Sequence, residues 1–565
     1  ALFMNHAHCI VGYKQANLAI VPSKLARDFK EFALGNSGAL PLLYVSKVGE
    51  VSAGHLCKDS DVRTDVPVYQ VVEKGTKTKF EWSDMVTFYF GCSFSFNQIL
   101  LENKMLTPNA RNVSMYRTNI DCYSCGEFQC KMMVSMRAIS KDHLSKLHEI
   151  TAKLPDVHGA PIHYGNSGKI GISDLQDYMG ESTEFGENDV PVFWCCGITG
   201  IESLTTAKID RCFTHSPGSM FITDVLQEKA EISTDPKDMC EVVEYSKNLY
   251  SAVSKHTIEK MEAIYNIVKS DPGKRGIKNL IAEGGFVKAT LALSHANKVA
   301  IVTGAPVHLT HQQLDETDGL PGVISLAVAL QSLGKTVDVL ADEYSIAATR
   351  NIIAKCLKLG IIKNNLNVVP TRKFEMFTAD KNPNYDVFLA TERLGQAKDG
   401  HFYSMLAKDL SQYIDPVDDT FMQSTNHPDV VTIAIGDGGN ELGMGNALEN
   451  VVKYIPNGKK IACVISSNNL IAAGVSNWGC YGLALSLYLA MSCPVHERYV
   501  RRAVGFPVDV AAMMKNALPS VEREREILNV TEEFGFRDGR SPDTLMSVDG
   551  LLFDKEHQQV IRGML

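Results

Sequence analysis

The second half of the chain alternates short, mainly apolar segments with longer helical segments, and this pattern constrains the fold more than any other feature of the sequence. Strands that are apolar throughout are buried on both faces, which is typical of a parallel sheet covered by helices. Five segments have this character: residues 298–303, 336–340, 385–390, 430–435 and 460–465. We expect helices between most of them, at residues 322–333, 345–359 and 478–491. We therefore predict a doubly wound, mainly parallel α/β domain over residues 276–565.

The first half is less regular. Apolar, β-branched and aromatic runs predict strands at residues 66–72, 85–91, 115–120, 132–139 and 190–196. Ser23 can cap a helix over residues 24–34, in which apolar residues recur at helical spacing. The irregular order of strands and helices predicts a mixed-sheet α+β domain over residues 1–235. Residues 236–275 are rich in charge and poor in glycine, so we expect a helical linker that ends in a turn-rich segment.

Composition limits the possible partners. A chain of 565 residues suggests two or more domains at about 150 residues each. The formal charge of −9 and the pI near 6.0 argue against nucleic acid or an anionic membrane as the main partner. No apolar run reaches the roughly 18 residues of a membrane-spanning helix. The sequence is compatible with a homo-oligomer. Because the chain begins with Ala1 rather than Met, we expect any targeting peptide to have been removed.

The segment from His158 to Asp177 gathers two imidazoles, a hydroxyl, an ammonium group and two carboxylates among glycines and a proline. Glycine allows a close approach of the backbone, and several backbone N–H groups can then converge on an anion. The segment is therefore a candidate wall of a binding pocket. The alternative is a polar loop made of one or two β-turns.

The predicted parallel sheet carries acidic residues where its strands end. Ligands of such sheets bind beyond the carboxyl ends of the strands. Carboxylates with few histidines are what Mg²⁺ or Mn²⁺ prefers, so we predict a possible divalent metal site at this edge. Alternatively, acids at a helix start favour the helix dipole and the glycines merely shape the turn. The candidate metal ligands are Asp315, Asp318, Glu392, Asp437 and Glu441.

These motifs resemble a known family in both halves of the chain. The first half resembles the D-glutamate cyclase family at residues 91–96, 111–117, 133–137, 158–177, 197–199 and 215–218. The second half resembles the D-glutamate cyclase-like C-terminal domain at residues 283–285, 303–306, 315–322 and 436–446. The fusion of both in this order is similar to that of the mitochondrial vertebrate members. The resemblance implies a hydro-lyase that dehydrates the small molecule D-glutamate to 5-oxo-D-proline in the mitochondrial matrix.

This ring closure assigns roles to the polar residues of the first half. The α-amine must lose protons, the γ-carboxylate must be neutralised, and the departing oxygen must be protonated, with no cofactor required. The catalytic candidates are the possible proton carriers His158 and His163, Asp177 to orient a histidine, and Thr199 as a donor. The substrate-binding candidates are Arg111, Arg117, Arg137, Ser167, Lys169 and His215, with an arginine suited to a carboxylate.

Two other functions remain open at this point. The acidic clusters of the second half would also suit a metal-dependent hydrolase that acts on a phosphate ester. The second domain could instead be a ligand-sensing module that regulates the first.

Overall fold

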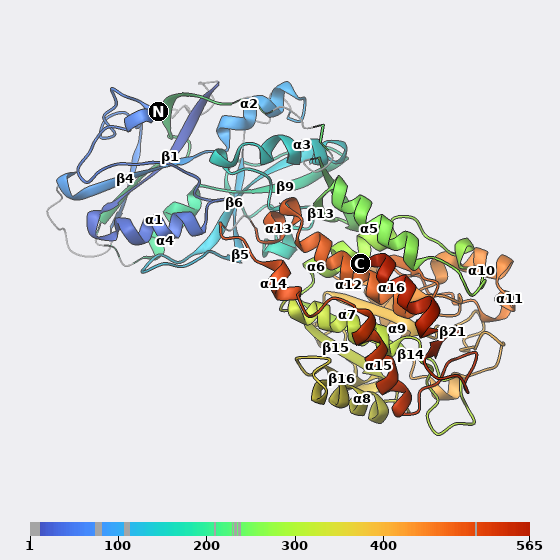
Figure 1. Ribbon diagram of the computed structural model, residues 1–565. Coiled ribbons are helices and arrows are strands. Elements are labelled where there is room, and N and C mark those ends of the chain that lie inside the picture. The colour runs from blue at the N-terminus through green and yellow to red at the C-terminus, as the bar shows by residue number, and fades with distance from the viewer. Residues whose placement is uncertain are drawn as a thin grey trace. The chain divides into compact units, whose positions relative to one another are not determined.

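The computed structural model describes residues 12–73, 82–106, 113–207, 209, 211–228, 230, 234–235, 239–502 and 505–565. The chain forms two compact units, and Figure 1 colours the chain by residue number. The N-terminal unit comprises residues 1–243, 248–255 and 494–508. The C-terminal unit comprises residues 244–247, 256–493 and 509–565. A late segment of the chain is therefore part of the N-terminal unit.

The N-terminal unit is built on two antiparallel sheets. The first has the order β2-β4-β1-β10-β3, and β11 also pairs with β1. Its strands are β1 (Tyr13–Pro22), β2 (Leu42–Val45), β3 (Tyr69–Glu73), β4 (Met85–Gly91), β10 (Arg211–His215) and β11 (Phe221–Leu226). The second has the order β7-β9-β6-β5-β8. Its strands are β5 (Ser114–Asp121), β6 (Lys131–Ser140), β7 (His163–Tyr164), β8 (Met179–Gly180) and β9 (Asp189–Cys195).

One apolar core joins side chains of both sheets with those of helix α1 (Ala26–Gly35). Phe29 of α1 lies at its centre, and its ring centroid is 5.0 Å from that of Phe88 and 4.9 Å from that of Phe128. Aromatic pairs at such distances add to the free energy gained from burial. The core fixes the sheets, and the sheets in turn place the strand ends that carry polar residues.

Two strands of this unit lead directly into helices. Strand β4 ends at Gly91 and α2 (Phe94–Glu102) follows, while β9 ends at Cys195 and α4 (Ile198–Thr206) follows. A further helix, α3 (Leu144–Ala152), comes after β6, and α13 (Pro494–Val500) packs against β13. Each strand-to-helix junction brings the N-terminus of a helix to the end of a buried strand.

The C-terminal unit contains a six-stranded parallel sheet of order β16-β15-β14-β17-β18-β19. The strands are β14 (Lys298–Gly304), β15 (Thr336–Ala341), β16 (Asn367–Pro370), β17 (Val387–Arg393), β18 (Val431–Gly436) and β19 (Asn469–Ala472). The first three strands extend the sheet in one direction and the last three extend it in the other. The order therefore reverses between β14 and β17, where doubly wound sheets bind ligands.

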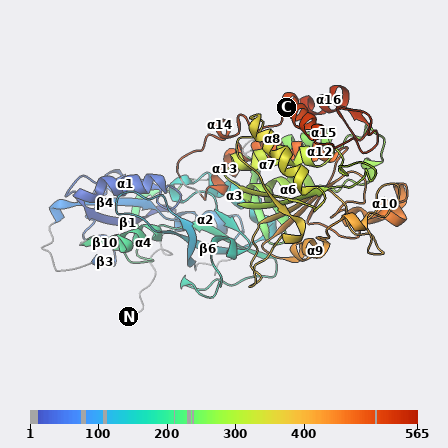
Figure 2. The same cartoon turned by 90° about the horizontal axis from the view of Figure 1, so that it is seen from below.

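Helices cover both faces of this sheet. Figure 2 shows α6, α7, α8 and α12 on one side and α9 on the other. The main helices are α5 (Lys255–Val268), α6 (Gly285–His295), α7 (Leu320–Ser332), α8 (Ile346–Lys358), α9 (Asp418–Asn426), α10 (Leu448–Tyr454), α12 (Ser476–Met491), α15 (Val521–Glu533) and α16 (Gln558–Met564). Among the described residues, no one helix is long and apolar enough to span a membrane. The predicted fold class, α+β followed by doubly wound α/β, is confirmed.

Three local predictions are wrong. Strand β1 was missed because Lys14, Gln15 and Asn17 make its first half polar, although all three are buried in the structure. The expected linker helix over residues 236–275 is shorter, since β12 (Cys240–Ser246) and β13 (Leu249–Ser254) precede α5. Their Val and Tyr residues favour a hairpin over a helix.

The third error concerns residues 460–465, which do not form a strand. They continue α11 (Gly458–Ile461) into irregular backbone, and the sixth strand is β19 instead. A short apolar run does not distinguish a strand from another buried segment, because it has no periodicity to measure.

We predict that Phe29→Ala lowers the free energy of unfolding of the N-terminal unit by about 3–5 kcal/mol, because it opens a cavity in the shared core. Denaturant unfolding followed by tryptophan fluorescence measures this change. Leu34→Ala on the same helix is the matched control, since Leu34 is 45% exposed, and its effect should stay within about 0.5 kcal/mol. Equal effects of the two substitutions would contradict this description of the core.

Candidate functional site

Arg137 of β6 is a buried cation without a counter-ion. Its side chain is 3% exposed, and none of the described carboxylates pairs with it. Nε and Nη2 donate to Asn97 Oδ1 over 3.2 and 2.8 Å, and Nη2 also lies 3.2 Å from Ser93 Oγ. Nη1 is buried and finds no acceptor. An unpaired charge in the interior costs several kcal/mol, so this arrangement points to an anionic ligand.

The surroundings keep Arg137 charged and fix its position. Its guanidinium carbon lies 5.0 Å from the centroid of the Phe96 ring and 5.1 Å from that of Trp194, so two aromatic faces hold the cation. Burial lowers the pKa of Arg137 to about 10, while the thiols of Cys92 and Cys196 act in the opposite direction. The guanidinium therefore remains protonated at neutral pH.

Two helix N-termini belong to the same site. Ser93, which contacts Arg137, is the N-cap of α2, and Cys196 directly precedes the first turn of α4. The N-terminus of a helix carries a partial positive charge and free N–H groups, which favour an anion. Close backbone packing requires glycine here, because a Cβ on Gly197 would lie 2.2 Å from Asn17 Nδ2.

His158 is the histidine that the structure brings to Arg137. Its Nδ1 lies 2.9 Å from the carbonyl oxygen of Gly38, so Nδ1 carries the hydrogen and Nε2 keeps a lone pair. The pKa of His158 is lowered to about 4, chiefly by burial and also by the positive charge of Arg137, while the hydrogen bond with Gly38 acts in the opposite direction. Its φ of 86° is rare for a residue with a side chain. A neutral imidazole thus lies within electrostatic range of a buried cation.

The other two candidate histidines are engaged with the backbone. His163 Nε2 lies 2.6 Å from the carbonyl oxygen of Asn166, and burial lowers its pKa to about 3. His215 Nδ1 accepts the N–H of Leu18 over 3.1 Å, and burial lowers its pKa to about 4. The structure places neither of them against Arg137.

Several predicted donors have structural partners instead. Thr199 Oγ1 accepts the N–H of Met133 over 3.1 Å and donates to the carbonyl of Cys196 over 2.8 Å. Ser167 Oγ donates to the carbonyl of Ile172 over 2.8 Å. Both hydroxyls are thus engaged in hydrogen bonds with the backbone.

The remaining candidates of the first half lie elsewhere. Arg117 is exposed and pairs with Glu202 over 3.2 Å. Asp177 lies in an exposed turn and makes no hydrogen bond to either histidine. Lys169 is half-buried, and its charge acts on His163 rather than on His158. Arg111 lies outside the residues that the structure describes.

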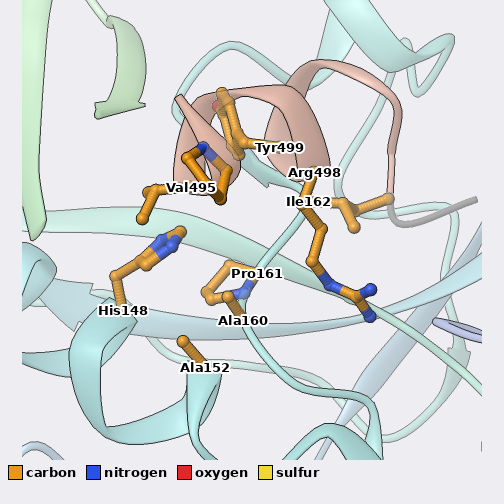
Figure 3. Close-up of a pocket in the computed structure, with 9 residues that line it drawn as sticks. His148, Ala152, Ala160, Pro161, Ile162, Val495, Arg498 and Tyr499 are labelled. Atoms are coloured by element: carbon orange, nitrogen blue, oxygen red, sulfur yellow. The ribbon is translucent and has the colours of Figure 1, made fainter. Parts of the chain in front are cut away.

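The segment that carries His158 continues into the wall of a pocket of about 190 Å³ (Figure 3). The residues that line this pocket are His148, Ala152, Ala160, Pro161, Ile162, Pro494, Val495, Arg498 and Tyr499. Figure 3 draws Arg498 and His148 on opposite sides of Ala160 and Pro161. The walls are mostly apolar, with the Arg498 guanidinium as the cation. Such a lining suits a small anion with an aliphatic chain.

Sequence reasoning missed Ser93, Asn97 and Arg498. The strand-to-helix junction after Gly91 contains both Ser93 and Asn97. Ser93 belongs to residues 91–96, which carried the family resemblance, so this segment could have pointed to Ser93. Arg498 follows α12 in the chain, and no local motif connects it to residues 158–162.

A second polar centre lies in the C-terminal unit, where β17 and β18 end. Asp318, Asp437 and Asp549 offer carboxylate oxygens within 4.8 Å of one another, and so do Glu392, Asp437 and Glu441. Arg275 Nη2 lies 2.7 Å from Asp437 Oδ1, and its Nη1 lies 2.5 Å from Asp549 Oδ2. Four of the five predicted metal ligands therefore lie in this centre: Asp318, Glu392, Asp437 and Glu441. Arg275 and Asp549 were missed because they are distant in sequence.

Asp315, the fifth predicted ligand, belongs to a different cluster. It accepts hydrogen bonds from Tyr344 over 3.0 Å and from Gln313 over 2.5 Å. Burial raises its pKa to about 6. The alternation of side chains along residues 315–318 separates it from Asp318.

The chain thus combines an antiparallel α+β unit, which holds the buried cation of Arg137, with a doubly wound α/β unit. Residues 86–224 match the family described as D-glutamate cyclase, and residues 264–565 match the family described as D-glutamate cyclase-like, C-terminal. The human protein named D-glutamate cyclase, mitochondrial, is 32% identical over 577 residues, which cover 98% of this chain and 93% of that protein. The chain therefore belongs to the D-glutamate cyclase family, as its motifs predicted.

Shorter relatives match about two fifths of the chain. A predicted hydro-lyase of Rhizobium johnstonii is 43% identical over 225 residues, which cover 38% of this chain and 84% of that protein. A predicted hydro-lyase of Bacillus subtilis is 38% identical over 232 residues, which cover 39% of this chain and 90% of that protein. Relatives of this length occur without the rest of the chain.

We predict that the N-terminal unit loses stability as the pH falls from about 6.5 to about 4. Its buried histidines are neutral in the folded state, whereas those of the unfolded chain bind protons below about pH 6.5, so protonation favours unfolding. Burial lowers the pKa to about 4 in His148, His158 and His215, and to about 3 in His163.

Denaturant unfolding at pH 7.5 and pH 5 measures this loss. His215→Asn should make the loss smaller, since its side-chain oxygen can still accept the N–H of Leu18 and it cannot titrate. His55→Asn is the matched control at an exposed position. A pH dependence that is unchanged by His215→Asn would contradict the assignment.

Proposed function

We propose that the protein cyclises D-glutamate to 5-oxo-D-proline in its N-terminal unit, with Arg137 binding the reacting carboxylate. Family membership makes the chain a hydro-lyase, and the human relative is named for this reaction. Residues 86–224, which match the cyclase family, include both Arg137 and His158. The observation that carries the proposal is the buried Nη1 of Arg137, which has no acceptor.

The reaction joins the α-nitrogen to the γ-carbon and expels one carboxylate oxygen as water. The ammonium group loses two protons, and the departing oxygen takes up both, so no external acid or base is consumed. Charge develops on the γ-carboxyl oxygens as the C–N bond forms. A preorganised cation in a site without water stabilises this charge more than it would in solution.

We place the γ-carboxylate at Arg137 because of the guanidinium geometry. An anchor for the α-carboxylate would use two parallel N–H groups. Here Asn97 and Ser93 occupy Nε and Nη2, which leaves Nη1 as one donor, next to the N-termini of α2 and α4. Arg498 on the far side of residues 159–162 is the candidate for the α-carboxylate, since its Nη2 lies 3.8 Å from a Cβ placed on Gly159.

His158 is the candidate proton carrier. Its Nε2 has the lone pair that can accept a proton from the substrate ammonium, and the imidazolium can return that proton to the departing oxygen. The positive charge of Arg137 opposes a lasting imidazolium, so the proton is passed on rapidly. Because both reacting groups belong to one molecule, a bound, folded substrate gains much of the rate from proximity.

The human relative is named as mitochondrial, and we propose the mitochondrial matrix as the location of this chain too.

We predict that Arg137→Met lowers kcat/KM for D-glutamate by about 10³-fold or more, since it removes the charge that stabilises the transition state. Arg117→Met is the matched control on the neighbouring strand, because Arg117 forms an exposed ion pair, and it should retain activity within about twofold. Product formation is measured by chromatography, and unfolding curves show that both variants are folded. A folded Arg137→Met protein with normal turnover would refute the proposal.

We predict that His158→Asn lowers kcat by about 10²-fold with a smaller change in KM, because it removes the proton carrier. Asn tolerates a positive φ, and its amide can still donate to Gly38, so the backbone is expected to be retained. Steady-state kinetics measure the two constants. If kcat is unchanged, another group carries the proton.

A further inference from the structure

The acidic centre of the C-terminal unit is not used by the cyclisation chemistry. We infer that it binds one divalent cation of the oxygen-preferring class, Mg²⁺ or Mn²⁺, through Asp318, Asp437 and Asp549, with Glu392 beside them. The inference is independent of the proposed cyclase site, because all of its residues belong to the C-terminal unit.

The spacing of the oxygens fits such a cation. The ligand atoms of the three aspartates all lie within 4.8 Å of one another, and all three side chains are buried. Bonds of about 2.1 Å place oxygens on opposite sides of a Mg²⁺ ion about 4.2 Å apart. Small side-chain adjustments would therefore allow all three carboxylates to coordinate one ion.

The charge of the centre is unbalanced. Three further carboxyl groups, those of Glu316, Glu392 and Glu441, join the three aspartates, and Arg275 is the cation that the structure places against them. A bound divalent cation would supply the missing positive charge.

An unpartnered polar group at the centre points independently to a ligand. Thr303 is 5% exposed, and its Oγ1 has no hydrogen-bond partner. A Cβ on Gly319 would lie 2.5 Å from this oxygen and 3.0 Å from Glu392 Cβ, so the hydroxyl lies close to Gly319 and to Glu392. A group buried in this way requires a partner.

The position in the sheet agrees with a ligand site. Thr303 and Glu392 are the next-to-last residues of β14 and β17, which are the two strands between which the strand order reverses. The Gly-rich turn after β18 does not bind a phosphate directly, because Glu441 accepts the N–H groups of residues 437, 438 and 439 over 2.6–2.7 Å. An anionic ligand of this sheet would thus have to be held through a cation.

Arg275 would compete with a metal ion for the aspartate oxygens. It pairs with Asp437 and Asp549, two of the three proposed ligands, and a bound metal would displace it. Removing the guanidinium should therefore strengthen metal binding, whereas a purely structural ion-pair cluster would gain no metal affinity.

The test is a Mn²⁺ titration of the metal-stripped, full-length protein, followed by electron paramagnetic resonance of free Mn²⁺. We expect one ion per chain, displaced by excess Mg²⁺. Asp318→Asn and Asp549→Asn should each weaken binding at least tenfold, and Arg275→Gln should strengthen it. Asp315→Asn, at an equally buried acid outside the centre, is the matched control and should leave affinity unchanged. Mn²⁺ should also raise the melting temperature of the wild-type protein.

Two results would overturn the inference. The first is a wild-type protein that binds no Mn²⁺ up to millimolar concentration and gains no thermal stability from it. The second is binding that persists unaltered in both Asp318→Asn and Asp549→Asn. Because the readout is metal binding rather than turnover, neither result depends on the cyclase proposal.

Discussion

A guanidinium enclosed by protein without a carboxylate to balance it is the feature on which the functional account depends. Folding removes Arg137 from water, and two aromatic rings and two polar side chains compensate for only part of the lost hydration. We propose that a bound substrate carboxylate recovers the remaining cost. The proposed function assigns catalysis to the N-terminal unit rather than to the C-terminal acidic centre, which would repel D-glutamate.

The architecture around Arg137 follows from the two sheets. Strand β6 carries the arginine, and strands β4 and β9 end where α2 and α4 begin, so both helix N-termini reach the site from fixed strands. Glycines at these ends permit backbone distances that a Cβ would prevent, as at Gly91, where it would lie 1.7 Å from the carbonyl of Asp156. A site built on strand ends and helix starts is rigid, which is what stabilisation of a transition state by fixed charges requires.

The sequence predicted the fold class and the parallel sheet because buried strands and amphipathic helices leave periodic patterns. It did not predict β1, since buried polar residues such as Asn17 are satisfied only by contacts across the sheet, here by the carbonyl of Gly91. Arg137 and His158 could be nominated from residue type alone. Their isolation from carboxylates could not, because it depends on which side chains of distant segments surround them. Thr199 was also nominated from residue type, and in the structure its hydroxyl accepts a hydrogen bond from the backbone of β6.

The two units place opposite charges in their interiors, a cation in one and an excess of carboxylates in the other, which argues for two different ligands. The most direct test of the central claim is a crystal structure with bound glutarate, which has the two carboxylates of the substrate but lacks the amine and cannot cyclise. The account predicts a glutarate carboxylate within hydrogen-bond distance of Arg137 Nη1. Glutarate bound elsewhere, with Arg137 still unpaired and enclosed, would contradict it.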